Sequence, residues 1–124
     1  MITNTETQNT YGSIRPQSLV INDKKELYKS YMSFIQNGGI FMPFNEDVTP
    51  DKVSMGQKIL IVFSMLDSKQ KIPIQGKIVW ISRNGINRGI GVAFGDTPHM
   101  KSLRESIEAN IADLIIKKEP TYTI

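Results

Sequence analysis

The chain has 124 residues, 40% of them hydrophobic, and carries 15 Lys and Arg against 12 Asp and Glu. This length is typical of one domain that buries a core of its own. Because the sequence contains no cysteine, a disulfide framework, a thiolate metal site and a cysteine nucleophile are excluded. The net charge of +3 comes from scattered lysines, whereas nucleic-acid binders usually show a dense basic stripe.

No stretch of the sequence has the pattern of a membrane span or of a secretory signal. The longest nearly uncharged run, residues 53–66, is interrupted by Lys58 and is shorter than the roughly 20 apolar residues that cross a bilayer. The first seventeen residues contain no apolar stretch and no basic region of the kind that opens a signal peptide. We therefore expect a cytoplasmic protein.

The N-terminal residues differ in composition from the rest of the chain. Residues 1–17 are rich in Thr, Asn, Gln and Ser and hold almost no large aliphatic side chains. Such a segment buries too little surface to offset its ordering entropy, so we predict a flexible leader. One domain is expected over residues 18–124, and it opens with the short apolar piece 18–21.

Five segments with strand character follow, separated by turn signals. The glycines after Asn37 predict a hairpin between the first two segments. Gly76 in the fourth segment predicts a bulge or bend of a curling sheet, and the alternation there places Trp80 on one face with Ile78. Short connections between successive strands predict an antiparallel sheet or barrel. The five segments are residues 27–34, 39–44, 58–66, 72–81 and 89–94.

Toward the C-terminus the apolar residues recur at spacings of three and four, which predicts a helix packed across the open end of the barrel. Two starts fit: Thr97 as N-cap with Pro98 in the first turn, or Ser102 with Glu105 as a capping box. Pro120 ends the pattern. The apolar stripe consists of Leu103, Ile107, Ile111, Leu114 and Ile115.

Residues suited to catalysis are few. His99 is the single histidine and lies at a helix start, where a surface position is the simpler interpretation. One histidine without cysteine supplies no zinc site. The carboxylates Glu46, Asp47 and Asp51 lie in a loop beside Pro50, as solvated turn residues do. An enzyme is therefore the least favoured class of function, and no cofactor is expected.

Three blocks of the sequence, in order, resemble the PilZ domain family. They are residues 27–41, 72–81 and 87–94, and the Thr-x-Thr ending at 121–123 is similar to the branch of that family that serves type IV pilus biogenesis. The resemblance covers nearly everything from about residue 18 onward. It implies a mainly β fold: a six-stranded antiparallel β-barrel with a C-terminal α-helix, in which the region before Leu27 contributes one strand.

The sequence departs from the family members that bind cyclic di-GMP. Those members carry an R-x-x-x-R stretch ahead of the barrel and a D/N-x-S-x-x-G motif on the early strands, and arginine forks bind guanine edges and phosphates in pairs. Here Arg15 is the one arginine before Leu27. When the glycine of the second motif is aligned with Gly38 or with Gly39, the positions for the acidic or Asn residue and for the serine hold other residue types. The resemblance to the pilus branch implies little or no cyclic di-GMP binding.

The resemblance instead implies a non-enzymatic adaptor for pilus assembly and twitching motility. It would bind the pilus assembly ATPase and an EAL-domain signalling protein that senses cyclic di-GMP. Surface aromatic side chains are the usual anchors of such interfaces. On a strand, Tyr28 and Tyr31 face opposite sides, and we expect Tyr28 to face the partner. The candidate partner-binding residues are Tyr28, Tyr31, Phe34, Ile35 and Tyr122.

Two other functions remain open at this point. One is a nucleic-acid binder resembling an OB-fold, in which bases stack on Tyr28, Tyr31 or Phe41. The other is a cyclic di-GMP receptor with a divergent cationic clamp. The clamp would consist of Arg15, Lys24, Arg83 and Arg88.

Overall fold

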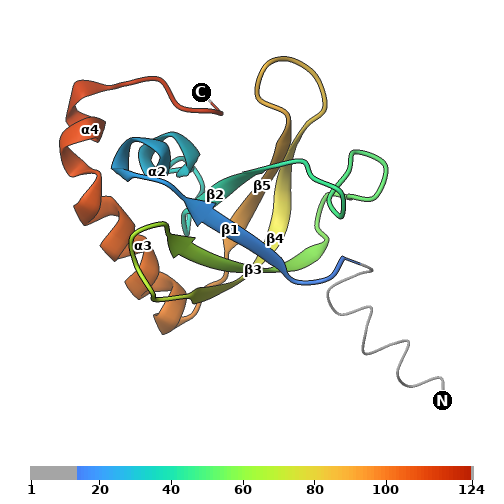
Figure 1. Cartoon of the computed structure of the whole chain (residues 1–124), viewed down its shortest axis with the longest axis horizontal. Helices are drawn as coiled ribbons and strands as arrows, with labels where there is room; N and C mark the ends of the chain where they lie inside the picture. The colour runs from blue at the N-terminus through green and yellow to red at the C-terminus, as the bar shows by residue number, and fades with distance from the viewer. Residues whose placement is uncertain (1–13, 124) are drawn as a thin grey trace.

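The computed structural model describes residues 14–123, and Figure 1 shows a curled β-sheet with helices along one side. The elements follow one another with short connections, apart from the long loop between the second and third strands. In chain order they are β1 (Gln17–Ile21), α2 (Lys24–Ser30), β2 (Gly39–Pro43), β3 (Lys58–Met65), β4 (Ile72–Ser82), β5 (Gly89–Phe94), α3 (Pro98–Asn110) and α4 (Ala112–Lys117).

The sheet is a half-barrel of five strands in the order β1-β3-β4-β5-β2. The expected six-stranded, wholly antiparallel barrel is thus wrong in two respects for the described residues: five strands are present, and β1 runs parallel to β3. The other three pairs are antiparallel. Because the chain enters a helix after β1, β1 has no hairpin partner next to it in sequence. The expected strand before Leu27 is confirmed by β1.

The segment 27–34, predicted as a strand, begins inside helix α2. The side chain of Asp23 caps this helix, because its Oδ1 accepts a hydrogen bond from the Glu26 N–H at 2.9 Å. The Glu26 carboxylate in turn accepts from the N–H of Asn22 at 2.7 Å. The first of these bonds satisfies an amide group that a helix start leaves without a partner, and a cap of this kind contributes about 1 kcal/mol. Leu27 then faces the core.

The gap between the two edge strands, β1 and β2, is closed by side chains and by α2. Gln17 at the start of β1 is buried and accepts a hydrogen bond from Asn45 Nδ2 at 2.9 Å. Its amide also donates to Asp47 Oδ2 at 3.4 Å, and Arg15 lies 3.6 Å from the same carboxylate. At the other end of the gap, α2 contacts both β1 and β2. Polar contacts and a short helix thus take the place of a sixth strand.

The predicted start of helix α3 at Thr97 is confirmed. Its hydroxyl accepts a hydrogen bond from the N–H of Met100 at 3.2 Å, and Pro98 occupies the first turn. The single helix expected to continue to Pro120 is interrupted at Ile111, and α4 is capped by Lys118 in a left-handed conformation. The apolar stripe is correspondingly graded: Leu103, Ile107 and Ile111 are buried, Leu114 is half-buried and Ile115 is 43% exposed.

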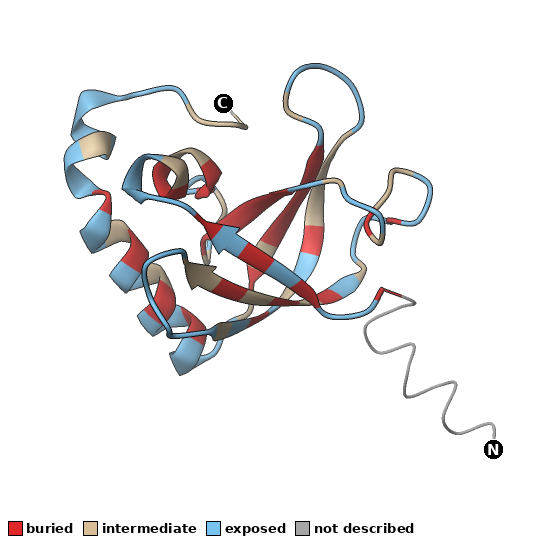
Figure 2. Ribbon diagram, viewed as in Figure 1, coloured by how far each residue is buried: buried red, intermediate tan, exposed pale blue. Residues whose placement is uncertain are grey.

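The inner face of the half-barrel meets α3 in one core. Figure 2 shows buried residues alternating with exposed ones along β1 and mostly with half-buried ones along β3, as a sheet covered on one face requires. The centre of this core is aliphatic, with side chains that have no exposed surface. These are Ile40, Ile59, Ile61, Ile74, Ile78, Ile90 and Val92.

A β-bulge in β4 changes which face Trp80 occupies. Gly76 pairs in register, so the bulge expected there is absent, and the register instead shifts between Ile78 and Trp80. Val79 is the additional residue, and it moves Trp80 opposite Gly91 on the outer face of the sheet. The expectation that Trp80 shares a face with Ile78 is therefore wrong, for a reason that alternation alone does not reveal.

Most of the predicted leader, residues 1–13, lies outside the described residues. Ile14 is only 6% exposed and Gln17 begins β1, so both belong to the domain and its start precedes residue 18. No helix among residues 14–123 combines the length and the apolar character needed to span a bilayer.

Candidate functional site

A second, smaller set of apolar side chains lies on the outer face of β2, β5 and β4. Met32 and Phe41 are fully buried, although neither belongs to the main core. They pack where β5 carries glycines: a Cβ on Gly91 would lie 2.6 Å from the Met32 sulfur, and one on Gly89 would lie 2.8 Å from the Phe41 ring. The missing side chains let the loop after α2 lie directly on the sheet.

Phe34 and Trp80 form the exposed part of this set. Their ring centroids are 5.8 Å apart with 62° between the planes, an edge-to-face contact. The Phe34 side chain is 48% exposed, while Trp80 is half-buried and its indole N–H has no acceptor among the described residues. Ile35, also half-buried, lies over Gly39 on the same side. We call Met32, Phe34, Phe41, Trp80 and Tyr122 the outer cluster.

Tyr122 joins this cluster from the C-terminal segment, residues 119–123. Its ring lies 5.5 Å from that of Phe41, and its N–H donates to the Lys29 carbonyl of α2 at 2.9 Å. The Asn87 amide donates to the carbonyl of Tyr122 at 3.3 Å. The segment therefore runs from α4 across α2 to the loop between β4 and β5, as the red end of the chain shows in Figure 1.

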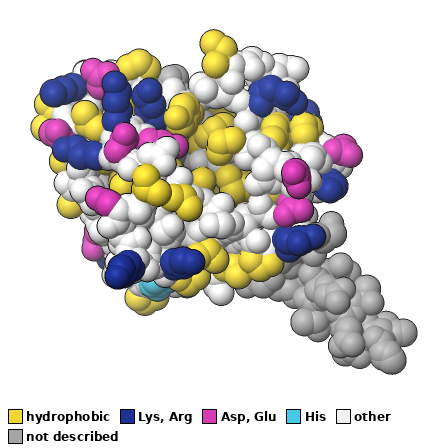
Figure 3. All heavy atoms as spheres, viewed as in Figure 1, with side chains coloured by type: hydrophobic (Ala, Val, Ile, Leu, Met, Phe, Trp, Pro, Cys, Tyr) yellow, Lys and Arg dark blue, Asp and Glu magenta, His cyan; other side chains and the backbone are white. Residues whose placement is uncertain are grey.

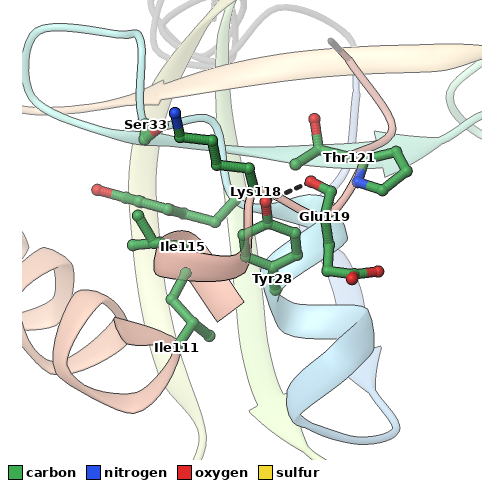
Figure 4. Close-up of a pocket in the computed structure, with 9 residues that line it drawn as sticks. Tyr28, Ser33, Ile111, Ile115, Lys118, Glu119 and Thr121 are labelled. Atoms are coloured by element: carbon green, nitrogen blue, oxygen red, sulfur yellow. Dashed lines mark hydrogen bonds between the residues drawn. The ribbon is translucent and has the colours of Figure 1, made fainter. Parts of the chain in front are cut away.

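Tyr28 occupies a different place from the one expected. It is 8% exposed, and its hydroxyl donates a hydrogen bond to the backbone carbonyl of Glu119. Figure 4 shows the ring directed toward that carbonyl, beside a pocket of about 350 Å³ that Ile111 and Ile115 also line. The prediction that Tyr28 faces a partner is therefore wrong, because helix α2 turns this ring inward to hold the C-terminal segment.

Tyr31 is also buried, at 3% exposure, and its hydroxyl donates to the Glu108 carboxylate of α3. Burial, followed by this hydrogen bond and the charge of Glu108, raises the pKa of Tyr31 well above its ordinary value of 10.0. The phenol of Tyr31 thus links the C-terminal end of α2 to α3 by a hydrogen bond. Of the five predicted partner-binding residues, only Phe34 is exposed; Ile35 and Tyr122 are half-buried.

The four cations of the alternative clamp do not converge. Arg15 pairs with Asp47 at the start of β1, whereas Lys24 lies beyond the end of β1 and pairs with Asp113 of α4 at 2.8 Å. The remaining two lie in the loop between β4 and β5: Arg83 donates to the carbonyl of Pro50 at 3.2 Å, and Arg88 donates to the carbonyl of Arg83 at 2.9 Å. In Figure 3 basic and acidic side chains are interspersed over the visible face.

The residues weighed for catalysis are dispersed. His99 is exposed at the start of α3. Asp47 is paired with Arg15, and Asp51 accepts a hydrogen bond from the Thr49 hydroxyl at 2.6 Å, which holds the pKa of Asp51 below its ordinary value. Within residues 14–123 no three His, Cys, Asp or Glu side chains are grouped so as to hold a metal ion.

Comparison with known proteins places this arrangement in a family. The model of the PilZ domain matches residues 15–113, from just before β1 into α4. No curated protein matches the chain. PilZ domains are generally non-enzymatic binding domains, so the match indicates a cyclic di-GMP-related or adaptor role. Since the matched residues cover most of the sequence and all five strands, the chain belongs to the PilZ domain family.

Proposed function

We propose that this protein is a non-enzymatic cytoplasmic adaptor for type IV pilus assembly and twitching motility. It binds the pilus assembly ATPase and an EAL-domain signalling protein, and does not itself bind cyclic di-GMP. The likeness of the Thr-x-Thr ending, residues 121–123, to the pilus branch of the family supports this assignment. The observation that carries the adaptor role is the half-exposed ring of Phe34 on the outer face of the sheet.

Phe34 has the properties of an interface anchor. Aromatic side chains give a large contact area for little loss of rotamer freedom, and they dominate binding energy when a partner excludes water from them. The edge-to-face contact with Trp80 restricts the Phe34 ring before binding. A partner that covers Phe34 also covers the edge of Trp80, so one apolar group gains contact with both rings.

The placement of the cations argues against a nucleotide clamp. Arg15 and Lys24 each have a carboxylate partner and lie at opposite ends of β1, which spans about 16 Å for five residues. Cyclic di-GMP binding remains the second candidate, because Arg15 and Arg83 both contact the loop of residues 44–57. A clamp of this kind would use Arg15, Arg83 and Arg88 without Lys24.

Co-purification with the pilus assembly ATPase from the same genome tests the adaptor role. We expect a stable complex with the wild type, weakened about tenfold or more by Phe34→Ala, the usual effect of losing an interface anchor. Ile86→Ala is the matched control, because Ile86 is 98% exposed in the loop between β4 and β5, outside the outer cluster. Failure of the folded wild-type protein to bind the ATPase would contradict the proposal.

The EAL-domain protein is tested in the same way, with cyclic di-GMP present and absent. Because we assign nucleotide sensing to that partner, the complex should depend on the nucleotide while this chain alone does not bind it. A complex that forms equally well without the nucleotide contradicts this part of the proposal.

A further inference from the structure

Lys58 and Lys77 stand directly opposite each other on β3 and β4. Both side chains are exposed, and neither has a carboxylate partner among the described residues. Like charges at directly opposed positions of an antiparallel pair destabilise the sheet. An anion bound between the two ammonium groups would offset this repulsion.

The two lysines flank a hollow of about 220 Å³ on the sheet surface. Gly76 of β4, Ala93 of β5 and Gly95, which follows β5, line it together with the lysines. The lining is mainly apolar, so the hollow suits an aliphatic chain that ends in a negative group. The hollow lies next to Trp80 on the outer face of the sheet. Lys77 is opposite Ala93 and Trp80 is opposite Gly91, two residues earlier on β5.

Beyond the lysines the outward side of β3 is aliphatic. Ile59 and Ile61 face the core, so the alternate residues Leu60 and Val62 point outward, where they are half-buried. Val20, opposite Ser64 on the neighbouring strand, is 45% exposed. An extended segment laid along β3 would therefore meet apolar surface at one end and two cations at the other.

The surroundings of the hollow favour a negatively charged partner further. A neighbouring hollow, also of about 220 Å³, shares Gly95 with the first and is lined by Lys101 and Arg104 of α3. Asp96 is the one carboxylate that lines either hollow. Four basic side chains against one acidic side chain make this end of the sheet complementary to an acidic group.

We propose that the hollow between Lys58 and Lys77 binds an acidic, otherwise aliphatic, extended segment of a protein partner. One carboxylate lies between the two ammonium groups, and the aliphatic side chains two and four residues along, which share its face of the segment, contact Leu60 and Val62. This inference rests on the proposed adaptor function, since it names the chemistry of the segment that the adaptor recognises. It adds a charged subsite next to Phe34 and Trp80.

Titration of the ¹⁵N-labelled full chain with two synthetic peptides tests the inference. One peptide carries a glutamate with valines two and four residues after it, so that the three side chains share one face of an extended chain, and the other has lysine in place of the glutamate. We expect the acidic peptide alone to shift the amide signals of Lys58, Lys77 and Ala93. Equal shifts with both peptides, shifts confined to other elements, or the same shifts with inorganic phosphate would overturn it.

Lys77→Glu separates binding from folding. The new carboxylate stands opposite Lys58, so this variant should melt at or above the wild-type temperature, while acidic-peptide binding weakens about tenfold or more. Lys71→Glu makes the same charge change at an exposed position before β4 and should leave binding unchanged. Undiminished binding by Lys77→Glu contradicts the inference. Because this test uses no pilus protein, it can succeed when co-purification with the ATPase fails, and fail when co-purification succeeds.

Discussion

The ring of Phe34 meets the indole of Trp80 edge-on, with 5.8 Å between the ring centroids. The two residues come from the loop after α2 and from β4, and their contact depends on the β-bulge that turns Trp80 to the outer face. Strand β4 thereby contributes Ile78 to the core on its inner face and Trp80 to the aromatic pair on its outer face. The outer surface carries the adaptor role proposed for this PilZ domain.

Phe34→Ala should leave the fold intact and change the environment of Trp80. Loss of an aromatic pair of this kind costs about 1 kcal/mol of stability, since Phe34 is half-exposed. Trp80 is the only tryptophan, so its fluorescence emission reports on this site alone and should move to longer wavelength as water reaches the indole. An unchanged emission maximum would show that Phe34 does not cover Trp80 in solution.

Tyr28→Phe should loosen the C-terminal segment without opening the core. The substitution removes only the hydroxyl that donates to the Glu119 carbonyl, a bond whose loss costs about 1 kcal/mol. Hydrogen exchange of the Tyr122 amide, which donates to the Lys29 carbonyl, should become faster. Amides in β3 serve as the internal control and should exchange as in the wild type. Unaltered exchange at Tyr122 would mean that the segment is held by other contacts.

The raised pKa of Tyr31 predicts that the protein loses stability at alkaline pH. Its pKa in the folded protein is raised above the ordinary 10.0, chiefly by burial and then by Glu108. The protonated phenol therefore stabilises the fold fully below about pH 10, and this contribution is lost as the pH rises toward the folded-state pKa. Urea denaturation at increasing pH should show a steeper alkaline decline for the wild type than for Tyr31→Phe. Parallel declines would contradict this role for Tyr31.

The ion pair between Lys24 and Asp113 predicts an effect at low pH. The hydrogen bond and charge of Lys24 hold the pKa of Asp113 below its ordinary 3.8. Because the folded-state pKa is lowered, the stabilisation is present above that ordinary value and is lost as the pH falls through the folded-state pKa. NMR titration of the Asp113 carboxyl should give a higher pKa in Lys24→Gln. A pKa that does not move would show that the pair is absent in solution.

Local sequence patterns were sufficient to predict four of the five strands of the sheet. The strands at β2, β3, β4 and β5 match the predicted segments to within one residue at each end, because each is a β-branched or aromatic run bounded by turn residues. Helix α2 was missed because Leu27 and Tyr28 are its only apolar side chains, too few to show a helical period. The Asp23 cap followed by Glu26 was the available signal for a helix start.

The candidate site was less accessible to sequence reasoning. Phe34 was among the predicted candidates, but its contact with Trp80 depends on an extra residue in β4 that alternation cannot reveal. The mistaken strand assignment also reversed the orientation of Tyr28. Lys58 and Lys77 were missed because cross-strand register, which brings residues from two separate strands opposite each other, follows from the three-dimensional pairing.

The most direct test of the central claim is a paired calorimetric titration of the full chain with the pilus assembly ATPase and with cyclic di-GMP. The adaptor proposal predicts a saturable complex with the ATPase, weakened by Phe34→Ala, and no detectable heat with the nucleotide. Nucleotide binding in the micromolar range that is lost in Arg15→Ala, together with no ATPase complex, would contradict it. In that case Arg15, Arg83 and Arg88 would mark the functional surface of this PilZ domain.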